Sequence, residues 1–203
     1  MGPAGFESYA RVWYLEEDRI SERVLFACLR VRLAGRTKTP GDCFHGLWVG
    51  AVSGMHGDPA RGISPWFPAS VLAGPKVRIP NREYMLFRGH LDDVGRWGAT
   101  DPTTGSSRDE EVPAPHLLWP ADHRWFAATD VDSEFTCLGG SQGLIHAVIT
   151  DPKLSAERFT AIERPAESRY KAHGSTAGSR STACLSSLCA EEEDVLVRLG
   201  HGR

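Results

Sequence analysis

Alternation of apolar and polar residues opens the chain. Phe6, Ala10 and Val12 fall on one side of an extended segment, and Arg11 falls on the other. A two-residue period is typical of a β-strand, so we expect residues 6–14 to form a strand with both faces partly covered.

A helical period follows this strand. Leu25 and Leu29 recur at helical spacing. Ser21 before them and Gly35 after them are typical helix boundaries. We therefore expect a helix between these two residues, although the end of the segment fits a strand equally well.

Short apolar runs between turn formers predict further strands. Residues 44–52 form one such run, and residues 76–88 form two, separated by Pro80 and Asn81. Residues 54–74 carry repeated Pro and Gly and predict a long loop. Loops of this length in compact domains are often functional or covered by a partner.

The second half of the chain repeats this order. Residues 123–129 and 134–138 predict two strands, and residues 141–149 predict a helix. Residues 99–115 are poor in apolar side chains and rich in turn formers, which indicates a flexible excursion. After about residue 160 the apolar pattern fails, and residues 156–203 predict a disordered or loosely attached tail, ending in a short helix.

This order of elements predicts an α+β fold. The neighbouring strand pairs are joined by turns too short for parallel crossovers, so the sheet should be mainly antiparallel, with one or two packed helices. Residues 1–155 are expected to form a single domain.

Charge and hydropathy limit the classes of partner and the cellular location that we expect. Lys and Arg total 23 and Asp and Glu total 26, a net charge of −3, which gives no electrostatic reason to bind nucleic acid. The densest apolar run, residues 24–33, is too short to span a membrane. The N-terminal residues lack the pattern of a signal peptide, and five cysteines form an odd set without a CxxC pair. We expect reduced thiols, a cytoplasmic location and no membrane or nucleic-acid partner.

Three phrases of the sequence carry a resemblance. They are GFESYAR (5–11), YMLFRGHLDD (84–93) and LLWPADHRWFAATDVDSEFTCLGGSQGLIHAVITDP (117–152). In them the chain resembles a family of uncharacterised actinobacterial proteins that share a similar WPAD, A-T-D-V-D, GGS and ADP progression. The resemblance implies one intracellular domain and supplies no activity, cofactor or catalytic residue. It ends near residue 155, where family members continue with a different acidic and Pro-rich segment.

The sharpest motif is GGSQG, residues 139–143, which matches the G-x-S-x-G pattern of a nucleophile elbow. A hydrolase built on Ser141 would need an acid and a histidine downstream in a parallel α/β sheet. The alternative is that Ser141 caps the following helix, and this alternative needs neither partner. We expect the cap. The same helix start lacks the Lys of a nucleotide phosphate site, so no nucleotide cofactor is expected.

Acidic residues offer a second candidate site. Asp130, Asp132 and Glu134 alternate, so a strand would aim all three at one face, where they could bind a hard cation. An exposed turn between strands prefers the same residue types, and we expect the turn. Cys43 with His45 lacks the repeated ligand pairs of a zinc site. No metal is therefore expected.

Tryptophans suggest a third candidate, a binding surface. Trp66, Phe67 and Trp97 lie beside Pro, Gly or charged residues, and aromatic side chains are favoured at binding hot spots. Filling the core is the competing interpretation. Because no strong catalytic motif is present, we expect a non-catalytic accessory module that binds a protein through residues 54–74. The alternative is a small hydrolase that uses Ser141 or a metal at Asp130 and Asp132.

Overall fold

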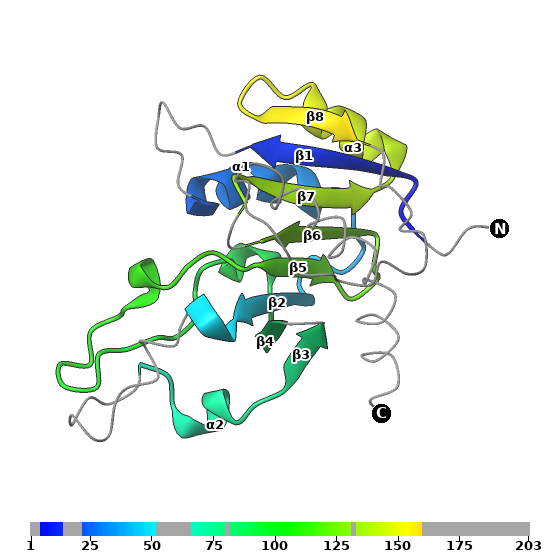
Figure 1. Cartoon of the computed structure of the whole chain (residues 1–203). Coiled ribbons are helices and arrows are strands. Elements are labelled where there is room, and N and C mark those ends of the chain that lie inside the picture. The colour runs from blue at the N-terminus through cyan, green and yellow to red at the C-terminus, as the bar shows by residue number, and fades with distance from the viewer. Residues whose placement is uncertain (1–4, 14–21, 52–65, 80–81, 131–132, 160–203) are drawn as a thin grey trace, which may run out of the picture.

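One antiparallel sheet organises the molecule (Figure 1). The computed structural model describes residues 5–13, 22–51, 66–79, 82–130 and 133–159. In these residues eight strands follow the order β3-β4-β2-β5-β6-β7-β1-β8, and every neighbouring pair is antiparallel. The α+β fold class with a mainly antiparallel sheet is confirmed.

The elements have the following bounds. The strands are β1 (Ser8–Trp13), β2 (Cys43–Trp48), β3 (Lys76–Ile79), β4 (Arg82–Gly89), β5 (Leu117–Pro120), β6 (Trp125–Thr129), β7 (Phe135–Gly140) and β8 (Ser155–Phe159). The helices are α1 (Glu22–Ala34), α2 (Ala69–Leu72) and α3 (Gln142–Ile149), with two 3-10 turns, η3 (Leu91–Asp93) and η4 (Asp109–Glu111).

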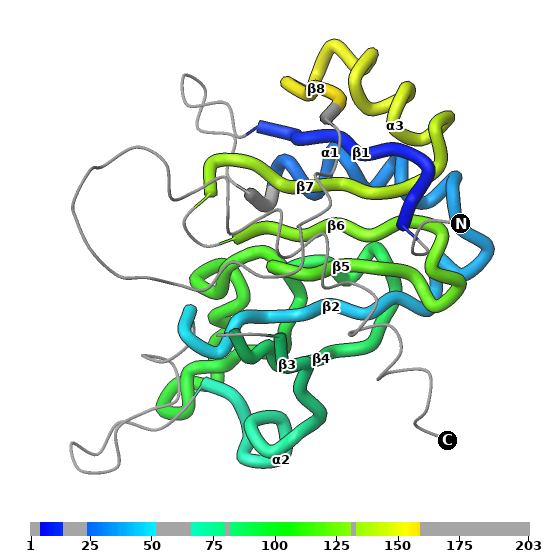
Figure 2. The backbone as a smooth tube through the Cα atoms, turned by 45° about the vertical axis from the view of Figure 1, so that its right-hand side comes forward, coloured from blue at the N-terminus to red at the C-terminus, as the bar shows by residue number. Residues whose placement is uncertain are grey.

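Helices α1 and α3 cover one face of the sheet, as the two views in Figures 1 and 2 show. Apolar side chains of both helices pack against Ala10 and Val12 of β1 and Leu138 of β7. Each strand residue that points to this face alternates with one that points away. The helical contributions are Leu25, Phe26, Leu29, Leu33, Leu144, Ile145 and Val148.

The opposite face carries mostly aromatic side chains. None of the described helices contributes to this apolar cluster. We call this surface the aromatic face and define it by the following residues: Trp13, Phe44, Trp48, Tyr84, Leu117, Trp119, Phe126 and Phe135. A sheet with two apolar faces needs cover on both sides.

Two strands of the sheet, β5 in its middle and β8 at its edge, depart from the expectation. Strand β5 was not predicted, because it is short and buried on both faces, without an alternating pattern. Strand β8 was assigned to the tail, yet it pairs with β1 from Trp13↔Ser155 to Tyr9↔Phe159. The tail therefore begins no earlier than residue 160, and the prediction of disorder for residues 160–203 lies outside the described residues.

The excursion at residues 99–115 is tied together by its own hydrogen bonds. The Ala99 amide donates to Asp109 Oδ1 at 2.9 Å, and the Arg108 amide donates to the Ala99 carbonyl at 2.8 Å. Arg108 also donates to the Asp101 carboxylate, and this bond lowers the pKa of Asp101 to about 2. The excursion is exposed at its tip, and these hydrogen bonds connect its two ends; that the segment is flexible stays a prediction.

Two expectations about location can be compared with the structure. The thiols of Cys28 and Cys43 are free, whereas Cys137 is disulfide-bonded, so the expectation of reduced thiols is wrong at Cys137. Among the described residues, no helix has both the length and the apolar character needed to cross a membrane.

Candidate functional site

Ser141 stands at the start of α3 and caps it. Its Oγ accepts a hydrogen bond from the Leu144 amide at 3.2 Å, and its backbone is extended, as an N-cap requires. No described histidine is hydrogen-bonded to this hydroxyl. The preceding strand, β7, belongs to an antiparallel sheet, which does not provide the setting of a nucleophile elbow.

The two glycines before Ser141 serve packing rather than a turn. Both lie in β7, and a Cβ at Gly139 would come within 2.5 Å of the Phe6 ring. A Cβ at Gly140 would come within 2.8 Å of Leu144. Neither glycine forms the turn that leads into α3. They allow close approach on the two faces of the strand.

Removing the cap should weaken the protein modestly. Ser141→Ala deletes the acceptor of the Leu144 amide, and we expect it to lower the free energy of unfolding by about 1 kcal/mol. Ser141→Asp keeps an acceptor and is the matched control. Urea denaturation measures both. Labelling of wild-type Ser141 by a fluorophosphonate probe would contradict a purely structural role.

The acidic candidates do not converge. Asp130 is buried and forms an ion pair with Arg82 at 3.0 Å, whereas Glu134 is exposed and Asp132 lies outside the described residues. No group of three or more His, Cys, Asp or Glu side chains in the described part of the chain is arranged to hold a metal ion. Among the described members of this set, Asp130 pairs with Arg82.

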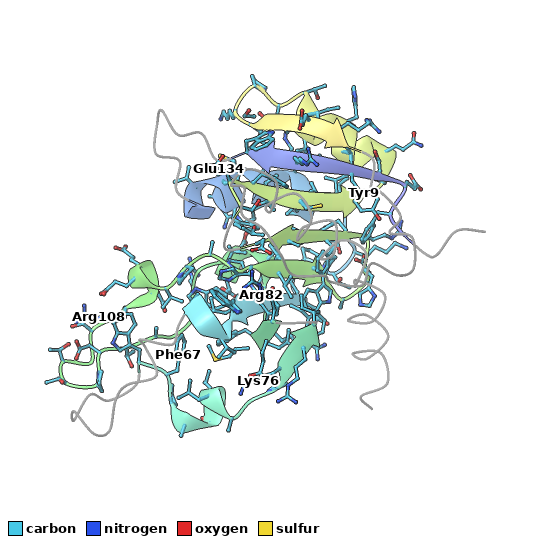
Figure 3. The ribbon with its side chains drawn as sticks, in the orientation of Figure 1. Tyr9, Phe67, Lys76, Arg82, Arg108 and Glu134 are labelled. Carbon is cyan, nitrogen blue, oxygen red and sulfur yellow. The ribbon has the colours of Figure 1, made fainter. Side chains whose placement is uncertain are left out.

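Around this ion pair the structure gathers a polar cluster that sequence reasoning did not find. The Arg82 guanidinium lies 4.9 Å from the centre of the Trp48 ring. His116 packs between Trp48 and Tyr84, with both ring centroids 6.3 Å away, and its Nδ1 accepts a hydrogen bond from the Trp48 amide. Figure 3 labels Arg82 over the sheet, near β2. Residues of β2 and β4 thus meet His116, which precedes β5, and Asp130, which follows β6, at one end of the aromatic face.

Burial controls the charge of His116. It lowers the pKa of this imidazole to about 4, with a smaller contribution of the same sign from Arg82, opposed by Asp130. His45, buried on the other face, also has its pKa lowered to about 4 by burial. Burial raises the pKa of the neighbouring Cys43 thiol to about 12. All three groups are neutral at pH 7, and the neutral state lowers the free-energy cost of burying them.

The centre of the aromatic face is a stack of three rings. Trp119 lies between Phe44 and Phe126, with centroid distances of 5.3 Å and 5.6 Å and interplanar angles of 16° and 27°. Arg88 extends the stack, because its guanidinium lies 5.4 Å from the centre of the Phe44 ring. The buried Nε1 of Trp119 has no hydrogen-bond acceptor among the described residues.

Arginines mark the rim of the same face. Arg11 lies 5.2 Å from the centre of the Phe135 ring, so each of three arginines faces an aromatic side chain. The Arg88 side chain is 65% exposed, and it donates two hydrogen bonds to Asp42, which lowers the pKa of that carboxyl. Aromatic rings with flat guanidinium groups are a composition found at protein interfaces.

The predicted binding residues cluster elsewhere, and mostly inside. Phe67 is 1% exposed and Trp97 is 7% exposed, and both pack against β2 and β4. Trp97 Nε1 donates to the Pro113 carbonyl at 2.9 Å. Trp66 keeps exposed surface and lies under Arg108 at 5.7 Å. Phe67 and Trp97 thus anchor the excursion on the sheet, and Trp66 is the member of the predicted set that solvent reaches.

Comparison with protein-family models, with curated proteins and with solved structures gives no match for this chain. Alternation within each strand could have placed Phe44, Trp119 and Phe126 on one face of their own strands. Their contact depends on the strand order β2-β5-β6, and no local pattern encodes that order.

Proposed function

We propose that this protein is a non-catalytic module that binds a protein partner through the aromatic face. The observation that carries the proposal is the ring stack at Trp119 with arginines at its rim. A Trp side chain in a structural core normally finds an acceptor for its Nε1. The buried Nε1 of Trp119 has none among the described residues, as expected for a group that a bound segment would complete.

The composition of the face describes the partner. Apolar side chains would pack on the rings of Phe44, Trp48 and Phe126, and a carboxylate would compete with Asp42 for the exposed Arg88. A segment that alternates apolar and acidic residues fits both requirements. Tryptophan and arginine are also the residues most enriched at binding hot spots.

This proposal moves the contact surface away from residues 54–74. Burial gives Phe67 and Trp97 a packing role, which supports the core interpretation for these two side chains. A hydrolase gains no support, because the Ser141 hydroxyl is used by the helix and Asp130 is paired with Arg82.

The binding proposal predicts a face-specific loss of complex. Arg88→Glu reverses an exposed rim charge, and we expect it to reduce the amount of partner retained from a lysate of the native cells about tenfold, because it turns attraction for carboxylates into repulsion. Val31→Glu, on the far side of α1 and 70% exposed, is the matched control. Pull-down with quantitative mass spectrometry measures both.

The pattern of loss identifies the surface. Equal losses in the Arg88 and Val31 variants, or no partner on the wild-type chain, would count against the proposal. If the partner is lost only in a Trp66→Ala variant, the contact surface is residues 54–74, as the sequence predicts.

We further propose a cytoplasmic location and membership of the actinobacterial family, on the three phrases quoted above. The free thiols of Cys28 and Cys43 support the cytoplasm, and the disulfide at Cys137 argues against it, because cytosolic thiols are usually kept reduced. Cell fractionation combined with alkylation of Cys137 decides between the two compartments.

A further inference from the structure

The centre of the aromatic face is shielded from solvent. Trp119 is 0% exposed and Leu117 is 1% exposed. Phe44 and Phe126 cover the two flat sides of the Trp119 ring, but side chains stand roughly perpendicular to a sheet, so its outer edge needs cover from above. The described helices pack into other clusters and do not supply this cover.

We propose that residues 185–199 of the same chain dock on the aromatic face and occupy it in the absence of a partner. This inference rests on the proposed function and adds how binding of the partner is regulated, because the partner must displace a segment of the protein itself. The segment is an intramolecular competitor of the kind of partner that the face fits.

The sequence of this segment matches the apolar part of the face. Leu185, Leu188, Leu196 and Leu199 recur at helical spacing, with Cys189 and Val195 beside them, and place one apolar stripe on a helix. The stripe is interrupted only by Glu192. An amphipathic helix laid on an apolar surface buries such a stripe against it.

The charges of residues 185–199 are opposite to those at the rim of the aromatic face. Glu191, Glu192, Glu193 and Asp194 form a run of four carboxylates in the middle of the segment. The guanidinium groups of Arg11, Arg82 and Arg88 lie over rings of the aromatic face. Opposite charges at the edge of an apolar contact favour one orientation of docking over others.

The chain is long enough for this contact. β8 ends at Phe159 beside β1, at one side of the sheet. The residues between Phe159 and Leu185 can extend to about 80 Å, and eight strands at about 4.8 Å spacing are about 35 Å wide. Residues 52–65 are the other long stretch outside the described residues, and they lack both an apolar stripe and a run of acids.

Hydroxyl-radical footprinting of the full chain tests the docking. In the triple variant Leu185→Asp, Leu188→Asp, Leu196→Asp we expect oxidation of Trp119 to rise about tenfold, because the cover is lost. Trp125, also 0% exposed but on the helical face, should stay protected and reports that the fold is intact. The control variant Ser186→Asp, Ser187→Asp, Val197→Asp adds the same charge off the stripe and should leave Trp119 protected. Protection of Trp119 in the first variant as well would overturn the proposal.

A second experiment does not depend on the stability of that variant. With Phe44 replaced by the photo-crosslinking analogue p-benzoylphenylalanine, irradiation should join position 44 to residues 185–199 of the same chain. Crosslinks to residues 52–65, or to a second copy, would overturn the proposal. Neither experiment needs a partner, so a docked segment without any partner would refute the proposed function alone. A partner bound by a chain whose segment does not dock would refute this inference alone.

Discussion

Acidification from pH 7 to pH 4 should destabilise the protein by several kcal/mol, through two buried histidines. His45 and His116 have pKa values of about 4 in the folded chain, against an ordinary value of 6.5. Above pH 6.5 neither state binds the proton. Between pH 6.5 and pH 4 these histidines are protonated in the unfolded chain and neutral in the folded chain. The free energy of unfolding therefore decreases as the pH is lowered, by roughly 3 kcal/mol per histidine.

Urea denaturation at a series of pH values measures this effect. His116→Asn keeps an acceptor near the position of Nδ1 for the Trp48 amide and removes the titration, so about half of the pH dependence in this window should disappear. His146→Gln removes an exposed imidazole on α3 and is the matched control. The carboxyls of Asp42 and Asp151, whose pKa values are lowered from 3.8, contribute only below this window. A stability that stays level from pH 6.5 to pH 4 would contradict the buried state of both imidazoles.

Trp119→Ala should cost about 3 to 5 kcal/mol of unfolding free energy, the largest single loss that we expect on the aromatic face. The substitution deletes a side chain that is 0% exposed and leaves a cavity between Phe44 and Phe126. It also removes an Nε1 without an acceptor among the described residues, which offsets a small part of the loss.

Comparison with two other substitutions isolates the packing contribution. Trp119→Phe keeps a ring in the stack and should cost less than the alanine variant. Trp66→Ala removes a partly exposed ring that lies under Arg108 of the excursion and should cost about 1 kcal/mol. Chemical denaturation of the three variants gives the order of their free energies of unfolding. A loss below about 1 kcal/mol for Trp119→Ala would show that the stack is not packed.

Regular local patterns predicted most of the fold. The alternation at β1, the period of α1 and the two paired strands β3 and β4 all reappear in the structure. Ser141 was recognised as a cap because the spacing of a helix start is local. The sequence pattern does not predict strand β5, because four consecutive apolar residues show no period. It does not predict strand β8 either, because the pairing of β8 with β1 depends on residues far from it in the chain.

The candidate site was less predictable than the fold. Trp66, Phe67 and Trp97 are singled out in the sequence because they lie beside Pro, Gly or charged residues, but exposure depends on what packs above a side chain. Asp130 looked like a metal ligand in sequence, and the structure places Arg82 beside it. In both cases the deciding contact comes from a residue more than a few positions away.

The amino-acid sequence by itself determined the elements whose hydrogen bonds and apolar periods lie within one segment, together with the antiparallel sense of strands joined by short turns. Only the tertiary structure decided that Phe44, Trp119 and Phe126 stack and that His116 lies among Trp48, Tyr84 and Asp130. Strand order is the physical reason. Which strands become neighbours depends on the burial of both faces across the whole sheet, and that free energy belongs to no single stretch of the chain.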